Sequence, residues 1–174
     1  MAVSSRWGVA RLLLSSVPFR AAFLVRVAQY APPVARKTIA AVNLTLHGID
    51  VDPRASLGPG LLLQHPVGVV IGGGAVVGAR CTIMSGAVLG RQSIHSGSDP
   101  NGYPKLGDNV LLGTGATVLG DTRIGNHGTI GAKSLVIRDV RAGATVVGIP
   151  ARETGSLNQS AQKVVRSAPS EPNA

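Results

Sequence analysis

The stretch from residue 106 to residue 136 reads LGDNVLLGTGATVLGDTRIGNHGTIGAKSLV, and it repeats a simple pattern every six residues. An aliphatic side chain stands at each sixth position, and glycine follows most of them. These aliphatic residues are Leu106, Leu112, Val118, Ile124, Ile130 and Val136. Two earlier runs keep the same period, one of them in a different phase: Ile71, Val77, Ile83 and Leu89, and Val51, Leu57, Leu63 and Val69. A period of six fits neither an α-helix nor a single alternating strand.

The six-residue period predicts a chain that turns a corner after every six residues. The aliphatic residue points inward on each side, and the glycine serves the corner, where a positive φ is easily adopted. Three such sides close a triangular coil of about eighteen residues, and stacked coils pair as parallel strands about 4.8 Å apart. Each coil buries little surface alone, so the stack supplies the core. The sequence therefore predicts a mainly β, parallel β-helical fold.

Length and composition agree with one such domain. The chain has 174 residues, and its hydrophobic fraction of 44% excludes disorder along most of its length. The aromatic fraction of 3% is too small for the usual core of a sandwich or helix bundle. A single cysteine, Cys81, excludes a disulfide scaffold and fits a reducing compartment, so we expect a cytoplasmic protein.

Three segments lie outside the repeat. Residues 1–46 are expected to be a partly helical, basic N-terminal segment, broken at Pro32 and Pro33. Residues 47–153 form the predicted β-helix, and residues 90–105 within it form a polar loop of the kind that often carries a binding function. Residues 154–174 are rich in Ser, Gln, Asn and Pro and are expected to be a disordered tail.

The net charge of +9 is concentrated near the N-terminus. The first acidic residue is Asp50, and it follows six basic ones: Arg6, Arg11, Arg20, Arg26, Arg36 and Lys37. Two interpretations stay open, a solvated or subunit-contacting helical segment and association with an anionic membrane surface. Nucleic acid is not an expected partner, because aromatic residues are not interleaved with the basic ones. The apolar stretch 12–19 is too short to span a bilayer.

The repeat resembles that of the left-handed parallel β-helix acyltransferases, and further motifs resemble the serine acetyltransferase branch. These motifs are GIDVDP at 48–53, QH at 64–65 with GVVIG at 68–72, YPK at 103–105 and VVGIPAR at 146–152. The resemblance covers residues 47–153. It implies a left-handed parallel β-helix that uses acetyl-CoA to acetylate a hydroxyl group. It also implies assembly at least as a homotrimer, with active sites between neighbouring β-helices.

The catalytic histidine of that branch corresponds to His65, and its paired aspartate corresponds to Asp50. A histidine accepts a proton near neutral pH, so it suits a general base for a hydroxyl nucleophile. A carboxylate behind the ring fixes the tautomer and stabilises the imidazolium. With a coil of about eighteen residues, Asp50 is expected near the corner beneath His65. The alternative for His65 is a solvent-facing corner residue.

Acetyl-CoA is expected along the last coils as the co-substrate. In the family that the sequence resembles, small side chains and backbone groups of the last coils leave room for the pantetheine arm. The corresponding positions in this sequence are Thr114, Ala132 and the turn Gly148-Ile149-Pro150. Three basic residues are candidates for contacts with the phosphates, or are simply solvated charges: Lys133, Arg138 and Arg152. The many glycines belong to the repeat and do not form a GxGxxG nucleotide motif.

The acceptor side departs from the serine acetyltransferase pattern. Gln64 stands where that branch has an aspartate for the amino group of serine, and Gly102-Tyr103 stand where it has Arg-His. With His95 in the polar loop, Gln64 and Tyr103 are the candidate acceptor-binding residues. A neutral amide and a phenol are weak partners for a zwitterion.

We therefore predict an acetyl-CoA-dependent O-acetyltransferase that acts on a hydroxyl of a small molecule or of a sugar or glycan intermediate. A serine O-acetyltransferase of cysteine biosynthesis is the alternative within the same class. A non-catalytic β-helical scaffold is the alternative from another class. The closely spaced histidines of a zinc-binding β-helix are missing, so no metal is expected.

Overall fold

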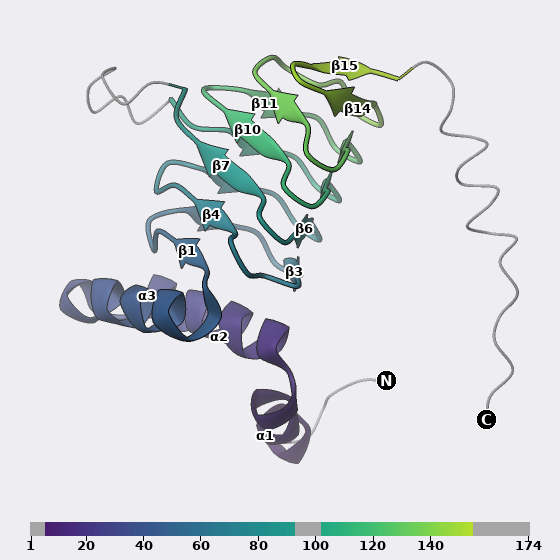
Figure 1. The fold of residues 1–174 in the computed structure, drawn as a ribbon. Helices are drawn as coiled ribbons and strands as arrows, with labels where there is room; N and C mark the ends of the chain where they lie inside the picture. The colour runs from purple at the N-terminus through teal and green to yellow at the C-terminus, as the bar shows by residue number, and fades with distance from the viewer. Residues whose placement is uncertain (1–5, 93–101, 155–174) are drawn as a thin grey trace, which may run out of the picture.

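A computed structural model describes residues 6–92 and 102–154 of the chain, and it consists of a helical layer and a parallel β-helix (Figure 1). The helices are α1 (Arg6–Ser15), α2 (Val17–Tyr30) and α3 (Pro33–His47). α2 and α3 lie across the end of the β-helix at which the first coil begins (Figure 1). His95, most of the predicted polar loop and almost all of the predicted tail lie outside the described residues.

In the described residues, fifteen short strands form the three faces of a prism. Sheet A contains β1 (Asp50–Val51), β4 (Val70–Ile71), β7 (Val88–Gly90), β10 (Thr117–Leu119) and β13 (Leu135–Val136). Sheet B contains β2 (Ser56–Leu57), β5 (Val76–Val77), β8 (Lys105–Leu106) and β11 (Arg123–Ile124). Sheet C contains β3 (Leu62–Gln64), β6 (Thr82–Met84), β9 (Leu111–Leu112), β12 (Thr129–Ile130), β14 (Thr145–Gly148) and β15 (Ala151–Glu153).

The chain visits sheets A, B and C in turn, and corresponding strands of successive coils pair in parallel. The predicted parallel β-helix is therefore confirmed. We name the three long edges of the prism by the sheets they join: the A–B edge, the B–C edge and the C–A edge. Only the last pair of strands, β14 and β15, is antiparallel among the described strands.

The aliphatic residues of the six-residue repeat form the core, as predicted. Leu63, Ile83 and Leu112 of sheet C are stacked in this way, and each is at most 1% exposed. The residue two positions before each of these aliphatic residues also points inward and is often small. Cys81, two positions before Ile83, is an example. Large and small side chains therefore alternate along each side of the prism, which lets them interdigitate in its narrow interior.

The first coil is longer than the sequence periodicity indicates. Gln64 pairs with Met84, whereas Val70 pairs with Val88, so the corner after β3 has two more residues than the corner after β6. The prediction that Val69 continues the run of inward sixth positions is wrong. Val69 occupies the inner position two residues earlier, and Ile71 takes the sixth position. The extra residues at the corner produce the change of phase seen in the sequence.

α2 closes the open end of sheet B. The Arg26 guanidinium donates to the carbonyl oxygens of Leu57 (2.6 Å) and Gly58, and the Gln29 amide donates to that of Ala55 (2.7 Å). The first coil has no coil beneath it, so these carbonyl groups would otherwise lack a protein partner. Arg26 therefore serves the fold.

α3 ends where β1 begins. Gly48 adopts the left-handed conformation (φ 64°), and its N–H donates to the carbonyl of Leu44 (2.9 Å), which is a common way to end a helix. Ile49 then enters the core with no exposed surface. This short transition fixes Asp50 directly beside α3.

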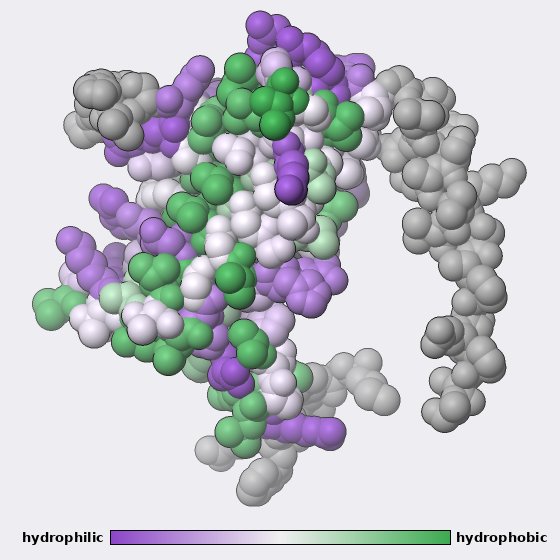
Figure 2. Space-filling view, viewed as in Figure 1, coloured by the Kyte–Doolittle hydropathy of each residue, from purple (hydrophilic) through white to green (hydrophobic). Residues whose placement is uncertain are grey.

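The helical layer keeps apolar side chains at its surface, next to its basic residues (Figure 2). Leu14, Tyr30 and Val34 are each more than 80% exposed. None of the helices in the described part of the chain is long and apolar enough to cross a membrane. Association with a membrane surface stays a prediction.

Candidate active site

His65 lies on the C–A edge, directly after β3, in the corner that is two residues longer than the next. Its backbone has a positive φ (52°), and its side chain is exposed. Gly68 closes the same corner by donating its N–H to the carbonyl of Gly48 (2.7 Å). Gly86 and Gly115 close the corresponding corners above, so His65 occupies the part of the corner that has no counterpart in those coils.

Asp50 is the first residue of β1 and also lies next to the C–A edge, with its side chain exposed. The bond between Gly48 and Gly68 joins the start of β1 to the corner that carries His65. Within residues 6–92 and 102–154, no hydrogen bond or ion pair joins Asp50 to His65. The proposed pairing of these two residues therefore stays a prediction, and the structure places both of them at one edge.

Two of the predicted acetyl-CoA residues share this edge. Thr114 lies between β9 and β10, and Ala132 lies between β12 and β13. The corners stack directly: Gly115 N–H donates to the carbonyl of Ser85 (2.8 Å), and Lys133 N–H donates to that of Thr114 (2.8 Å). Ser85, Thr114 and Ala132 thus form a column of small residues above the His65 corner. Ser85 was missed from the sequence, although its place in the repeat is equivalent to that of Thr114.

The turn between β14 and β15 reaches the top of the same column. Gly148 N–H donates to the Ser134 hydroxyl (3.1 Å), and Ser134 follows Ala132 and Lys133 on the C–A edge. Ile149 and Pro150 complete the turn, joined by a cis peptide bond. The C–A edge therefore carries both the His65 corner, at its lower end, and the Ser134–Gly148 contact, at its upper end.

Arg138 and Arg152 lie elsewhere. Both line a small cavity of about 180 Å³ between the last coil and β15, together with Asp139 and Glu153. Arg138 follows β13 on the A–B edge, so it is separated from the column that contains Thr114 and Ala132. Their predicted contact with CoA phosphates stays a prediction. Lys133, in contrast, lies in the column.

Tyr103 lies on the A–B edge, between β7 and β8. Its ring lies against Gly72, where a Cβ atom would come within 2.2 Å of the tyrosine Cε1, and the Arg91 guanidinium lies 4.9 Å from the ring centroid. His65 is on the C–A edge, at the opposite side of sheet A. Within one chain, the structure does not bring Tyr103 together with Gln64 and His65.

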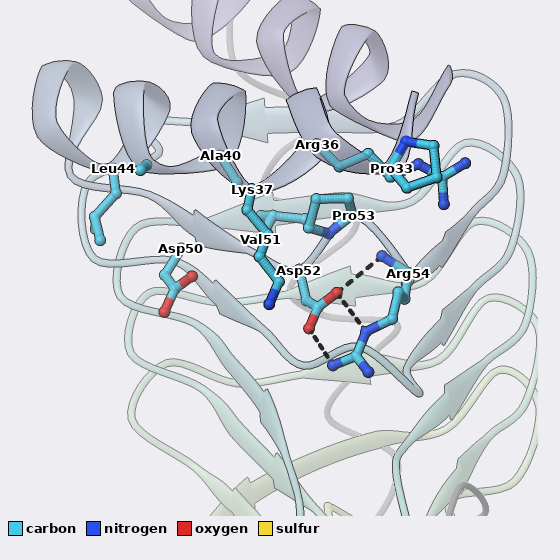
Figure 3. A pocket seen from close by; sticks show the side chains of 11 residues that line it. Pro33, Arg36, Lys37, Ala40, Leu44, Asp50, Val51, Asp52, Pro53 and Arg54 are labelled. Atoms are coloured by element: carbon cyan, nitrogen blue, oxygen red, sulfur yellow. Dashed lines mark hydrogen bonds and ion pairs between the residues drawn. The ribbon is translucent and has the colours of Figure 1, made fainter. Parts of the chain in front are cut away.

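A groove of about 510 Å³ runs between α3 and β1, next to the C–A edge (Figure 3). Ala40, Ala41 and Leu44 form its helical wall, and Asp50 lies at the end beneath Leu44. At the other end Arg54 forms an ion pair with Asp52 (2.7 Å), and the hydrogen bonds from Arg54 lower the pKa of the Asp52 carboxyl group. The sequence did not reveal this groove, because it depends on how α3 packs on the first coil.

The remaining reactive side chains do not form a second centre. In the described part of the chain, no three His, Cys, Asp or Glu residues are close enough together to share a metal ion. Cys81 is buried in the core, and its burial raises the pKa of the thiol. A buried thiol with a raised pKa is a poor nucleophile.

The comparisons with known proteins agree with this architecture. The family model for the bacterial transferase hexapeptide (six repeats) matches residues 103–138. A serine acetyltransferase of Synechococcus elongatus is 41% identical over 145 residues, which are 81% of this chain and 58% of the relative. The structure of the Neisseria gonorrhoeae serine acetyltransferase in complex with serine is 36% identical, with a TM-score of 0.74 over 83% of this chain and 60% of that one. A serine acetyltransferase structure in complex with CoA is 29% identical, with a TM-score of 0.73 over 83% of this chain and 60% of that one.

The fold, the stacked corners and the family model that matches residues 103–138 make the chain similar to the hexapeptide-repeat acyltransferases. Within that class, the chain resembles the serine acetyltransferases. It spans little more than half the length of these relatives.

Proposed function

We propose that this protein is an acetyl-CoA-dependent O-acetyltransferase and that His65 is its general base. One observation carries the proposal: His65 stands at the foot of a column of small residues on the C–A edge, which Thr114 and Ala132 continue upward. Such a column offers a path for an extended thioester arm, with Val67 beside it in the His65 corner and Lys133 beside it at Gly115. The CoA-bound relative supports acetyl-CoA as the acyl donor.

The chemistry requires one proton to be moved. His65 takes the proton of the acceptor hydroxyl while the hydroxyl oxygen attacks the thioester carbonyl carbon. The tetrahedral intermediate then expels the CoA sulfur, and the thiolate takes the proton back from the imidazolium. Asp50 would stabilise the imidazolium during this step, once the bound acceptor draws the two side chains together.

L-serine is the acceptor that the relatives support best, because both the curated relative and the serine-bound structure are serine acetyltransferases. The broader proposal includes a hydroxyl of another small molecule or of a sugar intermediate. Gln64 and Tyr103 remain candidate acceptor residues in either case. Since Tyr103 and His65 lie on opposite edges of sheet A, a site that uses both would need two chains, as in a homotrimer.

The test is CoA release from acetyl-CoA with L-serine as acceptor. We expect His65→Asn to lower the rate by about 10²–10⁴-fold, the usual contribution of a general base. Asparagine tolerates the positive φ of this position, so the variant should fold. His127→Asn is the matched control, because His127 is also an exposed corner histidine with a positive φ (60°), and it lies on the B–C edge.

Three other results would change the proposal. Equal loss of activity in both variants would contradict the role of His65. Binding of acetyl-CoA without transfer to serine would direct the search to sugar and other hydroxyl acceptors. If the protein failed to bind acetyl-CoA, the enzymatic function would be contradicted and a non-catalytic scaffold would remain.

A further inference from the structure

α2 has a second apolar side, which is exposed. Its residues are spaced by three or four positions and therefore lie on one side of the helix: Val17, Arg20, Phe23, Val27 and Tyr30. The four apolar side chains among them are between 36% and 86% exposed. Another side of α2 holds its buried residues, Ala21, Val25 and Ala28. α2 is therefore apolar on two sides, and the described residues cover one of them.

α1 extends this exposed side. The Arg20 guanidinium donates to the carbonyl oxygens of Leu13 (3.2 Å) and Leu14 (3.0 Å), at the C-terminal end of α1. This contact holds the Leu14 side chain, which is 84% exposed, next to α2. α1 itself stands off from the β-helix and packs on α2 (Figure 1). A hollow of about 270 Å³ between α2 and the first coil borders this surface at Phe23.

We call this surface the α1–α2 face, and define it by Arg11, Leu14, Val17, Arg20, Phe23, Val27 and Tyr30. Its charge is positive. Residues 1–49 contain six basic residues and no acidic one. Arg11 is exposed, and the groups that Arg20 binds are neutral carbonyls, so neither positive charge is cancelled by these contacts. A partner of the α1–α2 face must therefore offer both apolar surface and negative charge.

An anionic lipid surface offers both. Apolar side chains enter the boundary between headgroups and acyl chains, while basic side chains meet the lipid phosphates. The ring of Tyr30 suits this boundary, because it is apolar and ends in a polar hydroxyl. A second copy of the same face would cover the apolar side chains, but it would bring two positively charged surfaces together, which opposes association.

We propose that the α1–α2 face binds the surface of an anionic phospholipid membrane. Its apolar side chains insert between the lipids, and Arg11 and Arg20 lie among the phosphates. The β-helix then points away from the lipid, and the first coil, which carries Asp50 and His65, is the coil nearest to it (Figure 1). The proposal does not depend on the acetyltransferase function, because lipid binding is measured without turnover.

The test is sedimentation of the full-length protein with phospholipid vesicles. One set contains phosphatidylcholine alone, and the other contains phosphatidylcholine mixed with phosphatidylglycerol. We expect the partition coefficient to be about tenfold or more higher for the anionic vesicles at low salt, and to fall as salt screens the arginine charges. Equal partition into the two kinds of vesicle would overturn the proposal.

Two variants separate the charge from the apolar side chains. Arg11→Gln should lower partition into anionic vesicles about fivefold, as for one basic residue near the lipid. Arg123→Gln is its matched control, because it removes an exposed basic residue of β11, away from the helices. Leu14→Gln combined with Tyr30→Gln should lower partition about tenfold or more, because both side chains leave the lipid. Both residues are more than 80% exposed, so we expect an unchanged Tm.

Other results would also contradict the proposal. An equal effect of Arg11→Gln and Arg123→Gln would show that the net charge of the protein acts, and not this face. Unchanged vesicle binding in the Leu14 and Tyr30 double variant would show that the apolar side chains do not enter the lipid. If light scattering then finds fewer chains per particle in that variant than in the wild type, the face binds a second copy of the chain instead.

Discussion

His47 lies buried at the end of α3, three residues before Asp50. Its Nδ1 lies 2.8 Å from the Asn43 Oδ1, and the Asn43 amide donates to the carbonyl of Ala21 in α2 (3.1 Å). The asparagine oxygen is therefore the acceptor, and a neutral His47 donates from Nδ1. Burial, together with the positive charge of Arg20, lowers the pKa of His47. This pair holds the two long helices together beside the candidate site.

The lowered pKa of His47 predicts a loss of stability in mild acid. In the unfolded chain His47 titrates near 6.5, and in the folded chain only at lower pH, so the unfolded state binds more protons between these values. The contribution to stability is complete above pH 6.5 and is lost as the pH falls towards the folded pKa. We expect the Tm to fall between pH 7.5 and pH 5, and we expect a smaller fall in His47→Gln.

His127→Gln is the control for this pH dependence, because it removes an exposed histidine that lies far from the contact between α2 and α3. Asp52 and Asp121 have pKa values lowered by Arg54 and Lys105, so their contributions disappear only below their ordinary value of 3.8. They therefore do not interfere in this range. A pH slope in His47→Gln equal to that of the wild type would show that His47 is not the group responsible.

At the scale of the element, glycines allow successive coils to approach. A Cβ atom on Gly78 would lie 2.5 Å from the carbonyl carbon of Gly107 in the next coil. Gly143, on the B–C edge, has a positive φ (71°) and open space around it. The equivalent corners of other coils carry Arg80, Asn109 and His127, all with a positive φ. Contact with the next coil therefore requires glycine at position 78, whereas position 143 has room for other residues that adopt the left-handed conformation.

This difference predicts unequal losses of stability on substitution. Gly78→Ala should lower the free energy of unfolding by about 1–3 kcal/mol, because the coils must separate to admit the methyl group. Gly143→Asn should change it by less than about 1 kcal/mol, since asparagine tolerates the left-handed conformation and meets no neighbour. Denaturation in guanidinium chloride measures both. A Gly143→Asn variant as unstable as Gly78→Ala would contradict the assignment of backbone contact as the cause.

The repeat made the strands predictable from the sequence. The places where the structure departs from the repeat could not be predicted. Six-residue spacing identified the strands, because each inward aliphatic residue is separated from the next by one side of the prism. The longer corner at His65 was hidden, since Val69 preserves the spacing although it fills a different inner position. The roles of Arg26 and Gln29 were hidden as well, because their partners lie about thirty residues away in the sequence.

The candidate site was predictable in part for the same reason. His65, Thr114 and Ala132 were found one by one from motifs, and the stacking of corners shows that they share an edge. The sequence analysis also predicted Tyr103 as a residue of this site. The motif that identified Tyr103 does not reveal that it lies on the A–B edge, whereas His65, Thr114 and Ala132 lie on the C–A edge. The α3 groove was not expected at all, because it is formed by the packing of a helix on the first coil.

At the scale of the whole molecule, the positions of His65 and Tyr103 predict a site shared between chains. If the C–A edge of one chain meets the A–B edge of the next, each of three sites in a ring draws on two chains. In a ring of three chains that contains both His65→Asn and Tyr103→Ala chains, one junction combines an intact His65 with an intact Tyr103, so co-expression should restore about a third of the sites in the mixed oligomers. Each variant alone should be nearly inactive.

The measurement is CoA release by mixed oligomers purified through two different tags, with light scattering to give the number of chains. Oligomers of either single variant, mixed only after purification and assayed at once, are the control. Activity in the co-expressed sample that merely equals the mean of the two single variants would place the whole site within one chain.

Both ends of the β-helix are occupied by chain that does not continue the coil. α2 binds the carbonyl groups below sheet B, and β15 runs antiparallel along the last strand of sheet C. A bare coil end could serve as a template for a second molecule and start a filament, as unprotected sheet edges do. With these two sheets covered, growth of fibres along the prism axis is discouraged. We therefore predict that any assembly of this chain forms through lateral contacts along the edges that carry His65 and Tyr103.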